Sequence, residues 1–211
     1  MPEPAPRPDG DAVKRTAVVA TGNAHKVDEI RAALGGHGWD FVAAADLETG
    51  WPAPVEDGET FEDNARIKAL AAHERFRAAS LADDSGLEVD ALGGAPGVYS
   101  SRYAGEDADD AENNARLMRD MEQFAPGERA ARFRSTIVFI DEDGVETVAT
   151  GTCEGVIGTE PRGENGFGYD PLFLPAATPG CTMAELSMAE KNVISHRGAA
   201  LRALREMLGG L

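Results

Sequence analysis

The stretch TAVVATGNAHKVDEIRAAL, residues 16–34, decides the fold class. Its first five residues are small or apolar and predict a buried strand. Val27, Ile30 and Leu34 then recur at helical spacing. They predict a helix over residues 24–34, separated from the strand by a short turn. A strand, a turn and a helix in direct succession are typical of an α/β protein.

The same periodicities, followed outward, predict the rest of the chain. Strands are expected at 39–44, 80–92, 131–141 and 145–157, and helices at 60–77, 109–123 and 198–208. We expect the strand at 80–92 to break at Gly86 and resume, because glycine weakens a strand interior. The turn at 141–144, DEDG, predicts an antiparallel hairpin. In the helix at 60–77 the residues expected to face the core are Phe61, Ala65, Ile67 and Leu70. With no internal repeat, the pattern predicts one α/β domain with a mixed sheet over residues 16–211.

The charge of the chain excludes several classes of partner. Twenty basic against 37 acidic residues give a formal net charge of -17, which repels a nucleic-acid backbone or an anionic membrane. No apolar run approaches the ~20 residues of a membrane helix, and the N-terminus lacks the apolar segment of a signal peptide. We therefore expect a cytoplasmic protein that binds neither nucleic acid nor membrane. A small nucleotide with its own metal counter-ion is not excluded.

Neither the N-terminus nor the cysteines point to a function. Four prolines within the first eight residues, mixed with charge, predict a disordered leader over residues 1–15. Cys153 and Cys181 are too few for a disulfide framework and lack the paired spacing of a zinc site. We expect two unbridged thiols.

The turn after the first strand, TGN at 21–23, is a candidate anion site. Backbone N–H groups and the positive end of a helix favour an anion there. Lys26 follows in the first helical turn, within reach of a phosphate. Gly and Asn also serve such turns for geometry alone, with Asn23 as a helix cap. The residues by themselves leave both the phosphate role and the structural role open.

Carboxylates form a second candidate site. Asp83 and Asp84 lie at the end of an apolar strand, where a buried unpaired carboxylate is costly. Because strand side chains alternate between faces, we expect one to face the site and the other to support the backbone nearby. Glu56 lies among acidic residues at a helix entry, where such residues also merely complement the helix dipole. Gathered around one point with Asp84, these carboxylates would suit Mg²⁺.

Two later segments carry candidate ligand-binding groups. The run GFGYDP at 166–171 puts two aromatic rings and a carboxylate on a loop whose glycines permit close approach. Phe167 either stacks on a base or belongs to the core. At the start of the last helix Ser195 can act as the cap, while His196 and Arg197 present donors toward a keto oxygen or a phosphate.

Together these segments resemble one family, the inosine and xanthosine triphosphate pyrophosphatases that act on non-canonical purine nucleotides. The matching stretches are ATGNAHK (20–26), TFEDNA (60–65), ADDSGL (82–87), GAPGVY (94–99), SRY (101–103), GFGYDP (166–171), Lys191 and SHR (195–197). The resemblance covers residues 16 to 208. The block from 83 to 103 and the GFGYDP run are its specific parts, whereas the TGN turn alone would not be.

The resemblance implies a reaction, a site and a fold. Water attacks the α-phosphorus of a nucleoside triphosphate in the presence of Mg²⁺, giving a monophosphate and pyrophosphate. Asp84 is implied as proton acceptor and metal ligand, with Glu56 as the other metal ligand. The implied substrate-binding residues are Thr21, Gly22, Asn23, Ala24, His25 and Lys26 for the triphosphate, and Ser85, Phe167, Gly168, Tyr169, Asp170, Lys191, His196 and Arg197 for the rest of the nucleotide. The implied fold is a long mixed β-sheet with flanking helices in two lobes around a central cleft, commonly in a homodimer.

One departure and two rival interpretations bear on this prediction. Asp63 stands where members of the family often carry Glu, and its shorter side chain puts direct metal contact in doubt. A related pyrophosphatase family, first described through septum formation, usually has a turn rich in serine and arginine, unlike residues 21–26. A nucleotide sensor without turnover would not need a base beside a metal. Asp84, Glu56 and Lys26 together therefore favour an enzyme.

Overall fold

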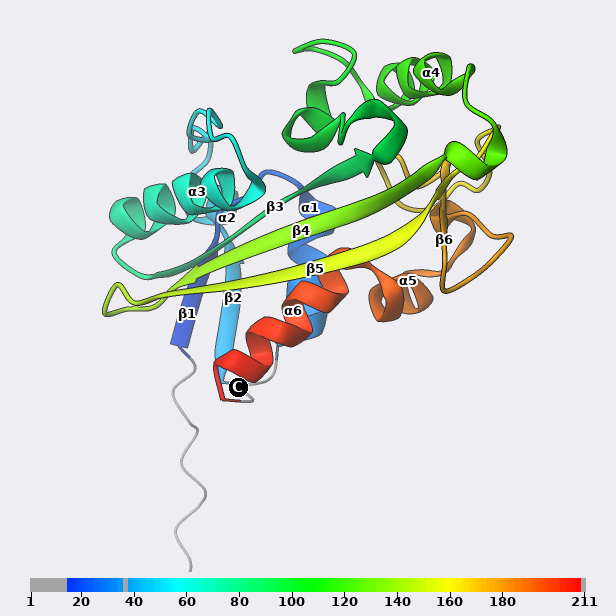
Figure 1. Cartoon of the computed structure of the whole chain (residues 1–211). Coiled ribbons are helices and arrows are strands. Elements are labelled where there is room, and N and C mark those ends of the chain that lie inside the picture. The colour runs from blue at the N-terminus through cyan, green and yellow to red at the C-terminus, as the bar shows by residue number, and fades with distance from the viewer. Residues whose placement is uncertain (1–14, 36–37, 210–211) are drawn as a thin grey trace, which may run out of the picture.

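The computed structural model of the chain describes residues 15–35 and 38–209. Its centre is a six-stranded sheet in the order β2-β1-β3-β4-β5-β6 (Figure 1). The strands are β1 (Arg15–Val19), β2 (Trp39–Ala43), β3 (Ala79–Val89), β4 (Ala130–Ile140), β5 (Glu146–Ile157) and β6 (Phe173–Pro175). β1 pairs in parallel with β2 and β3, whereas the β3–β4, β4–β5 and β5–β6 pairs are antiparallel. The prediction of a mixed sheet is confirmed.

Helices flank this sheet. They are α1 (Ala24–Leu34), α2 (Ala44–Leu47), α3 (Phe61–Phe76), α4 (Asp110–Met121), α5 (Met188–Ile194) and α6 (His196–Met207), with short 3₁₀ turns η1 (Asp90–Leu92), η2 (Gly97–Arg102), η3 (Pro126–Glu128) and η4 (Met183–Glu185). Successive residues of β1 point to opposite faces of the sheet. Val19 packs in the core formed with α1 and α6, and Val18 packs in the core formed with α3. Within the described ranges, no helix has the length and apolar character to cross a membrane.

The long strands β3, β4 and β5 extend from these two cores into a second lobe (Figure 1). There Leu87 of β3 and Phe133 of β4 join a third core with Leu117 of α4 and Phe173 of β6. Because the same strands serve both lobes, the middle of β3 lies where the lobes meet. The two-lobed arrangement agrees with the predicted fold.

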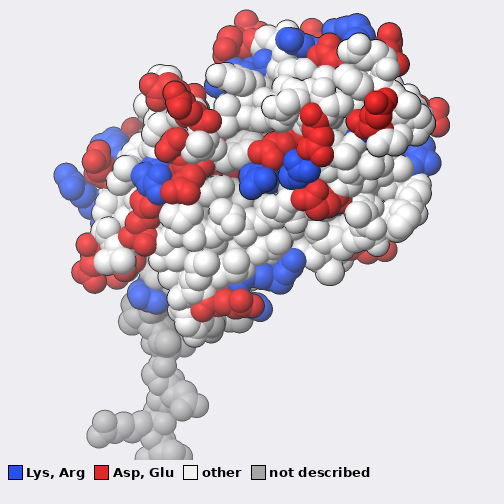
Figure 2. Space-filling model, in the orientation of Figure 1, with Lys and Arg blue, Asp and Glu red and all other residues white. Residues whose placement is uncertain are grey.

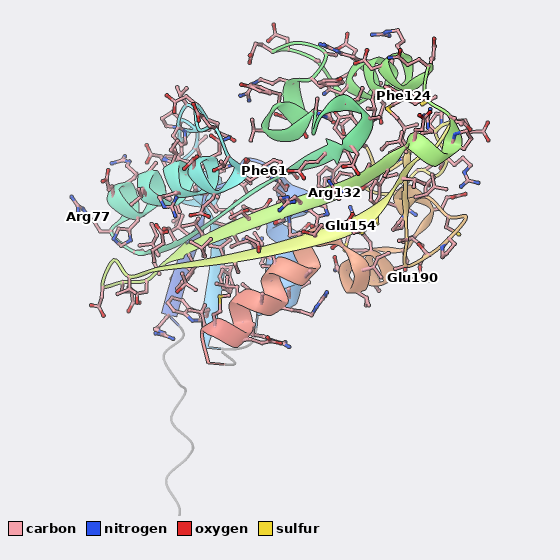
Figure 3. The ribbon with its side chains drawn as sticks, viewed as in Figure 1. Phe61, Arg77, Phe124, Arg132, Glu154 and Glu190 are labelled. Carbon is pink, nitrogen blue, oxygen red and sulfur yellow. The ribbon has the colours of Figure 1, made fainter. Side chains whose placement is uncertain are left out.

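On the face shown in Figure 2, acidic and basic side chains form small patches on a largely uncharged surface. Many of these charges are paired locally. On the open face of the sheet, Arg132 of β4 lies beside Glu154 of β5, with Nε 3.1 Å from the carboxylate (Figure 3). Arg132 also pairs with Asp90 at 2.8 Å. Such exposed pairs contribute little stability and need no further function.

Gly86 does not break the third strand, so that prediction was wrong. β3 runs without interruption from Ala79 to Val89. A Cβ atom at Gly86 would lie 2.4 Å from Ser100 Oγ and 2.5 Å from the Gly97 carbonyl oxygen. Glycine at this position therefore lets η2 pack closely on the strand.

The predicted core face of α3 was also partly wrong. Phe61 and Ala65 are buried, but Leu70 is 41% exposed. The buried stripe instead comprises Ala65, Ala69 and Ala72, together with Lys68. Small alanine side chains let the helix lie close to the sheet, so the bulkier Leu70 is left at the margin of the contact.

The other sequence predictions have mixed outcomes. The helix at 24–34 and the antiparallel hairpin are confirmed, and α2, α5 and β6 were not foreseen. Residues 1–14 of the expected leader lie outside the described residues, and Arg15 already belongs to β1. Cys153 is buried, Cys181 is exposed, and both are free thiols. The single domain over 16–211 stays a prediction.

Candidate active site

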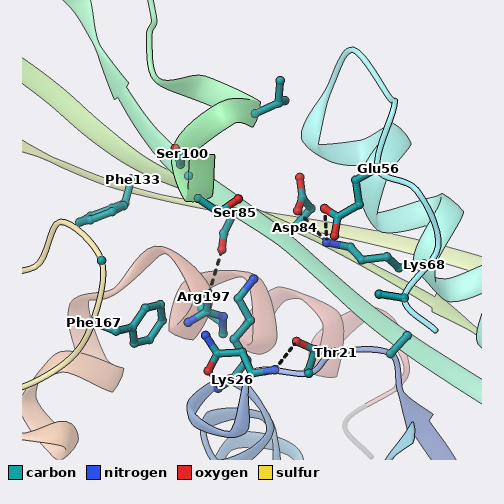
Figure 4. A pocket seen from close by; sticks show the side chains of 18 of the residues that line it. Thr21, Lys26, Glu56, Lys68, Asp84, Ser85, Ser100, Phe133, Phe167 and Arg197 are labelled. Carbon is teal, nitrogen blue, oxygen red and sulfur yellow. Dashed lines mark hydrogen bonds and ion pairs between the residues drawn. The ribbon is translucent and has the colours of Figure 1, made fainter. Parts of the chain in front are cut away.

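A pocket of about 340 Å³ lies where the two lobes meet (Figure 4). It collects side chains from segments that are far apart in the sequence. The predicted site residues that line it are Thr21, Gly22, Asn23, Lys26, Glu56, Asp84, Ser85, Phe167, Gly168, Tyr169, Asp170, Lys191, His196 and Arg197. Ala24 and His25 were predicted with them but do not line the pocket; the His25 ring stacks on Phe167 at 5.9 Å between centroids.

The turn between β1 and α1 forms one wall of the pocket. Asn23 caps α1, because its Oδ1 accepts hydrogen bonds from the backbone N–H groups of His25 at 3.0 Å and Lys26 at 3.4 Å. The Asn23 N–H group donates to Thr21 Oγ1 at 3.1 Å. The structural role considered for Asn23, that of a helix cap, is therefore confirmed. Thr21 and Lys26 still face the pocket, so the wall combines a helix N-terminus with a cation.

Asp83 is the supporting member of the aspartate pair, but it holds side chains rather than the nearby backbone that was expected. Its Oδ2 lies 2.8 Å from Lys26 Nζ and 3.1 Å from an Arg197 guanidinium nitrogen. Ser135 on β4 donates a further hydrogen bond to its Oδ1. Burial alone would favour the neutral acid, but Arg197 and Lys26 hold the pKa of Asp83 well below its usual range. The same burial lowers the pKa of Lys26 despite its pairing with Asp83.

Asp84 points into the pocket, as the alternation along β3 predicts. Its Oδ1 accepts a hydrogen bond from Lys68 Nζ at 2.7 Å, and that ammonium also lies 3.0 Å from Glu56 Oε2. Burial raises the pKa of Asp84 to about 6, while Lys68 opposes the rise. Burial in turn disfavours the ammonium, but Asp84 and Glu56 hold the pKa of Lys68 above its usual value. A carboxylate with a raised pKa in a pocket is a natural general base.

Glu56 is positioned by the loop before α3. The Gly58 N–H group in this loop donates to Oδ1 of the buried Asn64 at 2.8 Å, which ties the loop to the helix. Asp63, whose metal contact was in doubt, is absent from the pocket lining. Its Oδ2 instead accepts a hydrogen bond from Thr60 Oγ1 at 2.7 Å at the start of α3.

Aromatic rings and a neutral histidine form the other end of the pocket. Phe167 lies at the pocket edge with Lys191 Nζ 4.7 Å from its ring centroid. The His196 ring stacks on Phe133 at 4.8 Å, and its buried Nδ1 has no hydrogen-bond partner among the described residues. Burial lowers the pKa of His196 well below its usual value, with Arg197 adding to the effect. A neutral histidine in the pocket lining suits a site that receives an uncharged heterocyclic base.

A buried ionic network connects the two ends of the pocket. Lys191 Nζ lies 2.8 Å from Asp170 Oδ2 and 3.6 Å from Glu29 Oε1. Glu29 also pairs with Arg197, which reaches Asp83 and donates to Ser85 Oγ at 2.9 Å. Most of the guanidinium donors of Arg197 therefore serve the protein itself.

Several residues of this site were not predicted. Lys68 and Glu29 were missed, although Glu29 lies three residues after Lys26 and so on the same side of α1. Asp110 and Asn114 of α4 were also missed. Asp110 Oδ2 accepts from the Gly168 N–H group at 2.6 Å, and Asn114 Nδ2 donates to the Gly168 carbonyl at 2.8 Å. These two bonds hold the loop that carries Phe167 against the second lobe.

The donor set around Lys68 tests whether the pocket fits a metal. Oxygen atoms of Glu56 and Asp84 both accept hydrogen bonds from the Lys68 ammonium. The two carboxylates therefore already bind one cation between them. In the part of the chain that the structure describes, no three metal-ligating side chains gather. Two carboxylates nevertheless suit Mg²⁺, which uses few protein ligands and completes its shell with water and phosphate oxygens.

Comparison with known proteins places this geometry in a family. The sequence model of the Ham1 family matches residues 17–207. The chain is 48% identical to a dITP/XTP pyrophosphatase of Haemophilus influenzae over 93% of this chain and 100% of that protein. It is 50% identical to a dITP/XTP pyrophosphatase of Exiguobacterium sibiricum, over 90% and 96% of the two chains. A solved HAM1 protein of Coxiella burnetii superposes with a TM-score of 0.83 at 40% identity, over 93% of this chain and 100% of that one. The chain therefore belongs to the Ham1 family.

Proposed function

We propose that this protein hydrolyses non-canonical purine nucleoside triphosphates, namely those of inosine, deoxyinosine and xanthosine, to the monophosphate and pyrophosphate. Such an activity would cleanse the nucleotide pool. The observation that carries the proposal is the grouping in one pocket of Asp84 beside Glu56 and Lys68, of Lys26 at a helix N-terminus, and of Phe167 at the far end. Relatives named dITP/XTP pyrophosphatase, at 48% and 50% identity over nearly their whole length, support the same reaction.

The triphosphate is proposed to lie along the turn at 21–26. The N-terminus of α1 and the Lys26 ammonium offer positive charge there, which favours a phosphate locally although the whole chain carries a net charge of -17. Asp84 takes the proton from the water that attacks the α-phosphorus. In the metal-free site, burial raises the pKa of Asp84, which favours a role as proton acceptor. Ser85, next in β3, lies within reach of the same phosphate.

Glu56 and Asp84 are the residues proposed to hold Mg²⁺. When bound, the ion would polarise the phosphate oxygens and lower the pKa of a coordinated water. The oxygen donors that converge on Lys68 support this assignment. The chain's own cations, Lys26 and Lys68, then neutralise the remaining charge of the triphosphate.

Base discrimination is assigned to the opposite end of the pocket. Hypoxanthine and xanthine present a keto oxygen at position 6, where adenine presents an amino group. Phe167 offers a ring for stacking, and His196 and Lys191 line the same part of the pocket. A pocket that requires an acceptor at position 6 rejects a donor there, because buried polar groups would be left unpaired.

Two further properties complete the proposal. We propose that the protein is a homodimer and acts in the cytoplasm, as the family resemblance suggests. We also propose that the protein does not bind nucleic acid, because its net charge of -17 repels a phosphate backbone.

A substrate panel tests the proposed function. The kcat/KM values for the triphosphates of inosine, deoxyinosine and xanthosine should exceed that for ATP by ~100-fold or more, because the 6-amino group of adenine leaves buried polar groups unpaired. GTP keeps the keto oxygen at position 6 and should be rejected through its 2-amino group, which a tight pocket refuses. Pyrophosphate and orthophosphate are measured separately in each reaction. Comparable rates with ATP would contradict the assigned specificity. Tight binding of inosine triphosphate without turnover would indicate the rival nucleotide sensor.

A further inference from the structure

We infer that Lys68 occupies the place of the metal ion in the free enzyme and that metal binding displaces its ammonium toward the triphosphate. The inference rests on the proposed function, which puts the metal between Glu56 and Asp84. Lys68 Nζ lies 2.7 Å from Asp84 Oδ1 and 3.0 Å from Glu56 Oε2. The lysine is buried and lines the same pocket. A single ammonium therefore serves as the common counter-ion of the two carboxylates.

The ammonium and the metal cannot share this place. Mg²⁺ binds carboxylate oxygens at about 2.0 to 2.1 Å. Lys68 Nζ already lies 2.7 Å from Asp84 Oδ1 and 3.0 Å from Glu56 Oε2. An ion bound to the same two oxygens would therefore lie close to the ammonium, and the two cations would repel one another. With one ammonium, the two carboxylates leave this cluster a net charge of -1. A divalent ion added beside an unmoved ammonium would make it positive.

The Lys68 side chain is flexible enough for such a move, and phosphate oxygens would be its new partners. Its ammonium is carried on a flexible four-carbon stem, and its side chain rises from α3 at the pocket wall (Figure 4). The other cation at the phosphate end, Lys26, is already paired with Asp83 at 2.8 Å. Lys68 loses its two carboxylates when the metal takes them. The phosphate oxygens expected in the same pocket are then its nearest new partners.

The exchange couples the metal to the nucleotide. A metal that binds without nucleotide displaces the Lys68 ammonium from Glu56 and Asp84, and the ammonium then has no other anionic partner within the described part of the chain. When the metal binds together with a triphosphate, the phosphate oxygens become the new partners of the ammonium. The two ligands therefore strengthen each other's binding, and by thermodynamic linkage the effect is reciprocal. The enzyme binds the metal weakly until a nucleotide is present.

Metal binding to the nucleotide-free enzyme tests this directly, without any measurement of turnover. Mn²⁺ replaces Mg²⁺ as the probe, and the free ion is followed by electron paramagnetic resonance. Lys68→Met removes the competing charge, so we expect the dissociation constant for Mn²⁺ to fall by about tenfold or more, since a unit charge at such short range has a large electrostatic effect. Lys68→Arg keeps the charge and should stay close to wild type. Unchanged or weaker binding by Lys68→Met would overturn the inference.

Two controls separate this inference from its premise. Lys191→Met removes another buried pocket lysine, one that pairs with Asp170 rather than with the metal carboxylates, and it should not tighten Mn²⁺ binding. Equal tightening would indicate a general charge effect and would also overturn the inference. Asp84→Asn should lose Mn²⁺ binding, and if it does not, the proposed metal site itself is wrong. Thermal melting checks that each variant is folded, and Lys68→Gln replaces Lys68→Met if the latter does not fold.

Discussion

Replacing Asp84 by Asn should lower kcat for inosine triphosphate by at least ~100-fold and up to ~10,000-fold, the range expected for loss of a general base. The amide keeps the size of the side chain and can still accept the hydrogen bond from Lys68, which is 2.7 Å long in the wild type. It cannot take a proton from water, and it carries no charge for a metal. The measurement is steady-state hydrolysis at saturating nucleotide, with circular dichroism to verify the fold.

Asp63→Asn is the matched control for this loss. Asp63 is also an acidic residue near the metal loop, but its carboxylate accepts a hydrogen bond from Thr60, the N-cap residue of α3, and it is absent from the pocket lining. Its substitution should leave kcat within a few fold of wild type. An Asp84→Asn enzyme that keeps comparable activity would mean that the base is another residue.

Replacing the neighbouring Asp83 by Asn should instead destabilise the fold, by about 3 to 5 kcal/mol. Asp83 is the shared partner of Lys26 and Arg197 inside the protein. Removing its charge leaves Lys26 without its carboxylate partner and Arg197 with Glu29 alone as counter-ion. The cost of an uncompensated buried charge exceeds that of a lost neutral hydrogen bond. Urea unfolding of the two variants gives the free energies of unfolding.

The two adjacent aspartates should differ in their effect on the free energy of unfolding. Asp84→Asn should retain most of the stability, because its carboxylate lies at the pocket and its loss also removes a desolvated charge. An Asp83→Asn protein within about 1 kcal/mol of wild type would show that the buried network does not depend on this residue, since ordinary surface changes already span ±0.5 kcal/mol.

The local parts of the fold could be predicted from the sequence. The strand, turn and helix at 16–34 and the hairpin around DEDG are set by residues close together in the chain, so their apolar periodicity suffices. The helix α5 was missed, although Ser187 and Glu190 form a capping box that marks its start. The three-residue β6 carries too short a pattern to recognise. The passage of β3 through Gly86 depends on η2, a segment that packs on it from outside the strand.

Most of the residues that the resemblance implies line one pocket, and their roles stay predictions. The alternation along β3 correctly separated Asp83 from Asp84, because strand geometry fixes opposite faces. Lys68 was missed because the core face of α3 was assigned from its large apolar residues, and a lysine beside them is ordinarily exposed. Its burial depends on the alanine stripe and on carboxylates from two other segments. Such tertiary pairing leaves no local signal.

The most direct test of the central claim is the position of the bond that water breaks. Inosine triphosphate is hydrolysed to completion in water labelled with heavy oxygen, and the products are separated and examined by mass spectrometry. Attack at the α-phosphorus predicts that the label enters the inosine monophosphate and that the pyrophosphate carries none. Label in the pyrophosphate, or orthophosphate as the first product, would contradict the account.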